Sequence, residues 1–180
     1  MASMGSVSKR LANALGATVL ALHDRLVEAG VATLPRPADH PSAAASLALL
    51  GWVPMMPQSR LAYCLGLSQP ATVRLVDRLE ASGLLRRQRR RPGRETWVES
   101  TPDGRELARQ FGLRRRRVMA DVLESLPAAD QKALVALLEK LAAALLQSKQ
   151  HVMRICRLCD ARDCGRDEDC PMWRAARVLD

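Results

Sequence analysis

The sequence predicts a mainly α-helical protein with one small β-hairpin. Apolar residues make up 48% of the 180 residues and aromatic residues only 3%. Alanine and leucine supply most of the apolar residues, and both favour helices over strands. Leucine and valine also recur at steps of three and four along several segments, which is the spacing of one helix face. The exception surrounds Pro92 and Gly93, where a Pro-Gly turn separates two short runs suited to strands.

The chain is strongly basic, with a formal net charge of +9. Such an excess favours a polyanionic partner, either nucleic acid or an acidic membrane surface, although some proteins are basic without such a partner. No stretch is apolar for long enough to span a membrane. The apolar segment 11–26 is interrupted by His23, Asp24 and Arg25 and lacks a cleavage site, so we expect a cytoplasmic protein.

The first half of the chain divides into short helices. Residues 8–30 form the first, because Leu11, Leu15, Val19, Leu22 and Leu26 share one face, and Gly30 is a suitable stop. A proline-rich connector follows, and then a short apolar helix over residues 43–52. Pro54 and Pro57 bracket an expected turn. A second short helix over residues 58–67 ends near Gly66.

The next helix, within residues 68–83, completes a helix-turn-helix pattern. Ser68 is a good N-cap, and Gly83 is a good residue just beyond the end. Ala71, Leu75 and Leu79 form one apolar stripe. The positions expected off that stripe are Gln69, Thr72, Arg74 and Arg78. Two short helices joined at a glycine, the second with a polar outer face, are typical of this DNA-binding motif.

A hairpin and two longer helices are expected after the motif. Residues 84–88 and 95–100 are suited to strands, and a hairpin directly after a recognition helix is a wing. Thr101 caps a long helix that Pro127 ends. A last helix is expected to run from about residue 129 into the cysteine segment. Its apolar face holds Leu134, Leu137, Leu138, Leu141 and Leu145.

The motif region resembles a known family. "SRLAYCLGLSQPATVRLVDRLEASGLLRR", followed by "STPDGRELA", is similar to the MarR family of winged helix-turn-helix regulators over residues 45–110. The resemblance implies a two-fold dimer with intertwined first and last helices, a recognition helix in the major groove and a wing beside the minor groove. The expected parts are a dimerisation helix (8–30), the winged helix-turn-helix (43–100), C-terminal dimerisation helices (101–155) and a metal-binding segment (156–173).

The resemblance also implies which residues contact DNA. They are Ser68, Gln69, Thr72 and Arg74 on the recognition helix and Arg94 at the wing tip. The wing adds the charges of Arg89, Arg90 and Arg91. Glutamine can read adenine, and arginine can read guanine or neutralise phosphate, so the chemistry agrees.

Two observations leave alternatives open at this interface. Family wings carry an aspartate two residues before the tip arginine, where this chain has Pro92. Arg94 therefore lacks that partner, and its contact is less closely defined. Arg74 and Asp77 stand three residues apart on the expected helix, so Arg74 could instead form a solvated ion pair.

Four of the five cysteines lie close together near the C-terminus. Cys156, Cys159, Cys164 and Cys170 have the spacing C-x2-C-x4-C-x5-C, which suits tetrahedral zinc or an iron–sulfur cluster. The segment resembles the C-terminal 2Fe–2S loop of SoxR-type sensors, although its middle gap is four residues rather than one. We favour a 2Fe–2S cluster, and zinc remains the alternative. The fifth cysteine, Cys64, is expected to be a small buried hydrophobe.

The sequence thus predicts a homodimeric regulator that binds a double-stranded DNA operator. By resemblance it is a repressor that senses redox or iron–sulfur status through its cluster. The alternative is a regulator that responds to a small-molecule ligand and carries a structural zinc. An electron-transfer enzyme is disfavoured, because no flavin- or nucleotide-binding motif is present.

Overall fold

The protein is described here by a computed structural model that covers residues 6–36, 40–89, 95–159, 164 and 170–179. Its elements confirm the predicted fold class: mainly helical, with a small antiparallel sheet. In chain order they are α1 (Ser6–Val31), α2 (Pro41–Trp52), β1 (Met55–Pro57), α3 (Gln58–Leu65), α4 (Gln69–Ala81), β2 (Leu85–Arg89), β3 (Thr96–Ser100), α5 (Pro102–Leu123), α6 (Ala128–Ala144), α7 (His151–Ile155) and α8 (Pro171–Ala176).

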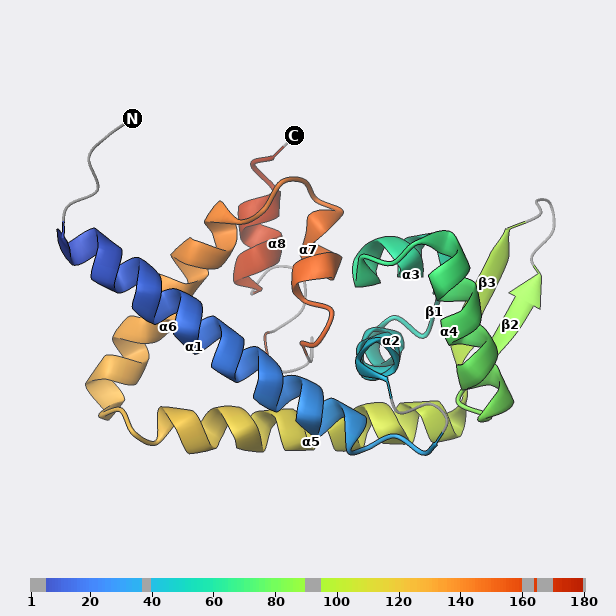
Figure 1. The fold of residues 1–180 in the computed structure, drawn as a ribbon. Helices are drawn as coiled ribbons and strands as arrows, with labels where there is room; N and C mark the ends of the chain where they lie inside the picture. The colour runs from blue at the N-terminus through green and yellow to red at the C-terminus, as the bar shows by residue number, and fades with distance from the viewer. Residues whose placement is uncertain (1–5, 37–39, 90–94, 160–163, 165–169, 180) are drawn as a thin grey trace.

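Residues 41–100 form the winged-helix lobe, in which three helices pack against the sheet (Figure 1). The central helix, α2, is buried along most of its length because it packs against α1, α3, α4, α5 and the sheet. This position explains its composition, which is almost wholly apolar. The main side chains of the core are Leu47, Leu49, Leu50, Met56, Leu61, Leu75, Val76, Leu79, Leu85 and Val98.

The sheet differs from the expected hairpin by one strand. Residues 55–57 were expected in a turn, but they pair with β3 as an antiparallel edge strand, with Met56 opposite Val98. A residue before proline prefers extended backbone, and proline is tolerated at a sheet edge because no partner there needs its missing N–H. The two prolines that indicated a turn are therefore compatible with this strand.

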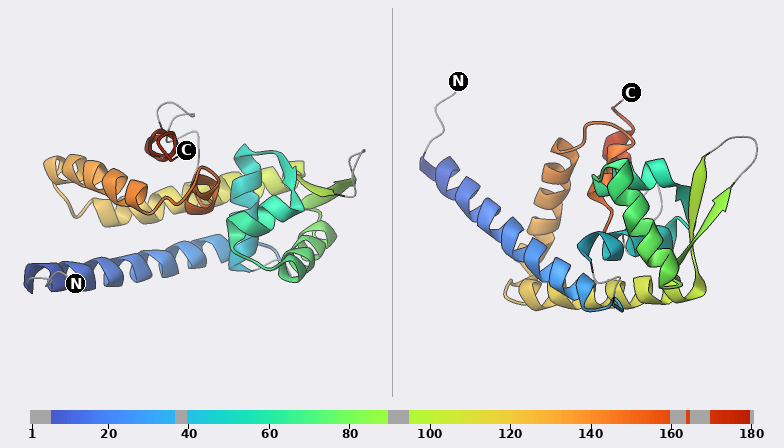
Figure 2. Two further views of the ribbon diagram at one scale, coloured as in Figure 1. Left: turned by 90° about the horizontal axis from the view of Figure 1, so that it is seen from above. Right: turned by 45° about the vertical axis from the view of Figure 1, so that its right-hand side comes forward.

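The long helices lie beside the lobe. Helix α5 packs across α2, which Figure 1 shows nearly end-on, and α1 packs on α5, so that the start of α1 extends away from the wing (Figures 1 and 2). The apolar faces predicted on the first and last long helices are largely exposed in the single chain. Leu11, Leu15, Val19 and Leu20 are exposed on α1, and Leu137, Leu138 and Leu141 on α6. No described helix is long and apolar enough to cross a membrane.

The C-terminal part corrects one expectation. The last long helix does not continue into the cysteine segment, because α6 ends at Ala144 and two short helices follow. The polar stretch 147–150 forms a turn, in which the Ser148 hydroxyl accepts the His151 backbone N–H at 3.3 Å. This turn lets Leu146 and Val152 pack with Cys170, Met172 and Ala176. We call these five residues the tail cluster.

Candidate nucleic-acid interface and cysteine site

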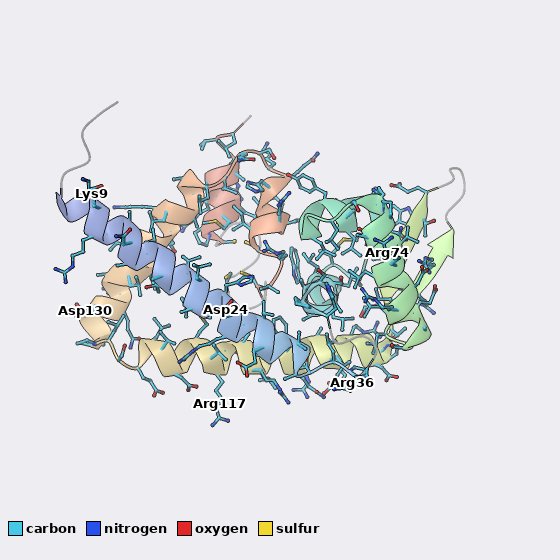
Figure 3. The ribbon with its side chains drawn as sticks, viewed as in Figure 1. Lys9, Asp24, Arg36, Arg74, Arg117 and Asp130 are labelled. Atoms are coloured by element: carbon cyan, nitrogen blue, oxygen red, sulfur yellow. The ribbon has the colours of Figure 1, made fainter. Side chains whose placement is uncertain are left out.

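The recognition helix α4 presents a polar face to solvent. Ser68 caps it as expected, since its hydroxyl accepts the Ala71 backbone N–H at 3.3 Å. Ser68, Gln69 and Arg74 are all exposed. Arg74 lies on the outer side of the lobe (Figure 3). Arg78, one turn further along, is exposed as well and shares a shallow surface hollow with Arg74. This face therefore offers one amide and two guanidinium groups to a partner.

Thr72 does not belong to that face, contrary to expectation. Its side chain is fully buried, and its hydroxyl donates to the Ser68 carbonyl oxygen at 3.0 Å. The buried stripe of α4 consists of Thr72, Leu75, Val76 and Leu79, the i, i+3, i+4, i+7 pattern of a helix packed on a core. The expected stripe was built only from i, i+4 steps starting at Ala71. It therefore included Ala71 in place of Thr72 and missed Val76. Thr72 thus supports the helix start and cannot reach DNA.

Asp77 pairs with the wing rather than with Arg74. Arg87 on β2 donates to Asp77 Oδ1 from Nη2 at 2.6 Å, and its backbone N–H donates to Glu80 Oε1 at 2.9 Å. Within the described residues, no ion pair joins Arg74 to Asp77. Arg87 therefore fastens the wing to the recognition helix, a role that sequence reasoning missed. The sequence feature that could have indicated this role is the i, i+3 spacing of Asp77 and Glu80, which places both acids on one face of α4.

The base of the wing is held by further polar contacts. Arg86 binds the carboxylate of Glu99 through two hydrogen bonds of 3.0 Å, across the strand pair. Ser59, at the start of α3, donates to Glu95 Oε1 at 2.8 Å. Arg89 is the last residue of β2. Arg90, Arg91 and Arg94, with Pro92 between them, lie outside the described residues, so their DNA contacts stay a prediction.

Residues 44–95 match the family model described as the MarR family. Over these residues the chain is similar to the MarR family. No significantly similar sequence was found among curated proteins.

Solved structures agree with this fold. The transcriptional repressor CouR, bound to a 23-mer DNA duplex, is 26% identical with a TM-score of 0.59, and the match covers 79% of this chain and 99% of CouR. RV1404 from Mycobacterium tuberculosis is 24% identical (TM-score 0.64, 81% of this chain and 99% of that one). The PcaV regulator from Streptomyces coelicolor, in complex with its natural ligand, is 25% identical with a TM-score of 0.52. That match covers 81% of this chain and 100% of PcaV. Roughly a fifth of this chain lies outside each match.

The cysteine segment is anchored beside the winged-helix lobe at both of its ends. Cys156 forms the C-cap of α7, where its backbone N–H donates to the Val152 carbonyl oxygen at 2.8 Å. Cys170 is the N-cap residue of α8 and is buried in the tail cluster. Cys156 and Cys159 are half-buried, and Cys164 is exposed. Helices α7 and α8 pack on each other and thereby hold the two ends of the segment together.

The Cys156 thiol is influenced electrostatically by the other three C-terminal cysteines. The pKa of Cys156 is raised, first by the hydrogen bond with Cys159, then by burial, and then by the nearby charges that Cys159, Cys170 and Cys164 would carry. The Cys159 backbone N–H donates to the Cys156 carbonyl oxygen at 2.8 Å, so the C-x2-C stretch is a tight turn. Within the described residues no three side chains already converge on one metal position. The donor set nevertheless fits zinc or iron–sulfur chemistry, since both accept four thiolates.

A cavity of about 360 Å³ lies between α2, α5 and the start of this segment. Its walls come from α2, α5 and the turn after α7, and include Trp52, Arg105, Arg109, Phe111 and Cys159. Trp52 Nε1 is buried and has no hydrogen-bond partner among the described residues. Glu106, on the same wall, has its pKa lowered to about 2, mainly by its hydrogen bond with Arg109. Cys64 is buried in α3, as expected, and burial raises its thiol pKa.

Proposed function

We propose that the protein is a dimeric transcription regulator that binds a double-stranded DNA operator. The observation that carries the proposal is the exposed face of α4, where Gln69, Arg74 and Arg78 stand on a MarR-family domain. In this arrangement α4 enters a major groove and the wing lies beside the adjacent minor groove. CouR, which shares the fold, is a repressor bound to a DNA duplex. By the family resemblance this protein is also a repressor.

The dimer supplies the second recognition helix. The exposed leucines of α1 and α6 form apolar faces that a single chain leaves in water, which is unusual for a monomer when such residues are contiguous. Pairing these helices between two chains would bury them. A two-fold dimer would then place two copies of α4 on half-sites about one helical turn apart, or a multiple of it.

The four C-terminal cysteines bind the cofactor of this regulator, a 2Fe–2S cluster. Cys156, Cys159, Cys164 and Cys170 would be the ligands, and such a cluster supplies reversible one-electron chemistry when bound. Support comes from the donor set, the anchoring of both ends of the segment and the resemblance to SoxR-type loops. The regulator would thereby respond to redox or iron–sulfur status.

A second candidate keeps the DNA-binding role but changes the signal. The cavity beside Trp52 is lined in part by Arg105 and Arg109, whose guanidinium groups suit a small anionic ligand. PcaV, of the same fold, was solved with its natural ligand. In this alternative the cysteines hold a structural zinc, and the ligand controls DNA binding.

The proposal is tested by selecting duplexes from a random pool with the purified full-length protein. We expect a pseudo-palindromic sequence to be enriched. Its affinity should fall by orders of magnitude between about 50 and 200 mM salt, because phosphate contacts release counterions. Enrichment of no sequence, or an affinity that does not change with salt, would contradict the DNA-binding role.

A further inference from the structure

Helix α7 belongs to two cores at once. Met153 is 4% exposed and is part of the core of the winged-helix lobe, while the adjacent Val152 is 1% exposed and lies in the tail cluster with Cys170. In Figure 1 this short helix stands between α3 on one side and α8 on the other. A helix of only five residues therefore joins the cysteine segment to the first helix of the helix-turn-helix.

One hydrogen bond and one close approach join α7 to α3 and to the turn that follows it. Arg60 on α3 donates to Met153 Sδ from Nη2 at 2.9 Å. The guanidinium of Arg154 lies against Gly66, so closely that a Cβ atom at position 66 would lie 2.9 Å from its Nη2. Gly66 also has a φ of 67°, the left-handed conformation that ends α3. Position 66 thus favours glycine for its backbone, and the absence of a side chain there leaves room for the Arg154 guanidinium.

The contact reaches the DNA-reading helix by a short path. Gly66 is followed by Leu67 and by Ser68, the cap of α4. At the other end, Cys156 caps α7 through the hydrogen bond to Val152, so a shift of Cys156 displaces the last turn of α7. From Cys156 to Ser68 every step is a covalent neighbour, a cap or a packed side chain.

We infer that the cysteine segment controls the DNA-binding lobe of its own subunit, through α7 docked on α3. When the cysteines hold their ligand, α7 is fixed and Arg154 supports the turn before α4. When the site changes state, α7 loosens and the turn loses that support. Arg154 is a positioning residue in this arrangement. The inference rests on the proposed function, of which it specifies the regulation.

The first test needs no DNA and uses amide hydrogen exchange on the full-length protein. In Cys156→Ser we expect faster exchange in residues 61–72 than in the wild type. Arg154→Ala should give a comparable increase, and the double variant should add little, because both changes interrupt one path. Arg177→Ala removes an equal charge from the exposed end of α8 and should leave exchange in residues 61–72 unchanged. Unaltered exchange in Cys156→Ser, or additive increases in the double variant, would overturn the inference.

The second test measures operator affinity before and after the bound metal is removed by a chelator. In the wild type we expect the two affinities to differ by about fivefold or more, the usual scale of coupling between sites. In Arg154→Ala the ratio should approach one while metal content stays as in the wild type. A wild-type ratio in Arg154→Ala would place the route in α6 and α8 and refute the path through α7. Absence of DNA binding in every form would refute the proposed function instead. The exchange experiment would then still test whether the cysteine segment is coupled to the turn before α4.

Discussion

Arg74 and Arg87 both stand at the junction of the recognition helix and the wing, yet their surroundings assign them different tasks. Arg87 is largely covered and already contacts Asp77 and Glu80. Arg74 is exposed. Arg74→Ala should therefore weaken operator binding by about 1–3 kcal/mol if the side chain contacts a base edge. The free energy of unfolding should stay within about 0.5 kcal/mol of the wild-type value. Titration of a fluorescent operator measures the first effect, and unchanged affinity would exclude Arg74 from the interface.

Arg87→Ala is the matched control, since it removes a neighbouring arginine that is engaged within the fold. The change removes the side-chain contacts to Asp77 and Glu80, although the backbone N–H of residue 87 still donates to Glu80. Because both acids are partly exposed, we expect the free energy of unfolding to fall by about 0.5–1 kcal/mol. Urea denaturation followed by circular dichroism measures this loss. Stability equal to that of the wild type would show that Arg87 does not fasten the wing.

Local rules were sufficient for some of these residues and not for others. The caps at Ser68 and Thr101 follow from short sequence windows, and both hydroxyls accept the backbone N–H that was expected. Thr72 and Asp77 could not be assigned in the same way. Whether Thr72 is buried depends on which side of α4 meets the core, and the partner of Asp77 comes from a strand ten residues later.

At the scale of elements, substitutions at Ser68, the N-cap of α4, can distinguish a role in helix stability from a role in DNA binding. Ser68→Ala removes the acceptor for the Ala71 N–H and should lower the free energy of unfolding by about 1 kcal/mol. Ser68→Asp retains a cap and should keep that stability, while its negative charge beside the DNA phosphates should weaken operator binding. If Ser68→Asp binds the operator as tightly as the wild type, the start of α4 does not approach DNA.

The elements that sequence reasoning missed are all short. Strand β1 has three residues and pairs with residues about forty positions later, so no local pattern can indicate it. Helices α7 and α8 are held by the tail cluster rather than by helix-forming sequence, and isolated helices of this length are unstable in water. The long helices and the helix-turn-helix could be predicted because periodicity, caps and glycine stops coincide there.

For the whole molecule, the exposed apolar faces of α1 and α6 predict an obligate homodimer. Leu15→Glu and Leu141→Glu place a charge on one face each, where the side chains are now 43% and 47% exposed. Each change should shift the protein toward monomer in sedimentation analysis, because a charge would have to be buried at the interface. Val178→Glu, at an 83% exposed position, should have no effect. Dimers that persist in both leucine variants would place the interface elsewhere.

The proposed cofactor concerns the whole molecule, because its ligands would come from the tail, which packs on the winged-helix lobe through α7. Anaerobically purified protein should contain iron and absorb visible light, and dithionite should bleach that absorption. If zinc is bound instead, the protein will be colourless and lose thermal stability on chelation, since structural zinc binding contributes folding free energy. Cys156→Ser removes one thiolate of the C-x2-C turn and should lose the metal, whereas Cys64→Ala, far from the segment in sequence and buried in α3, should retain it. A freshly prepared protein that contains neither iron nor zinc, and whose four C-terminal thiols all react in the native state, would contradict any metal centre there.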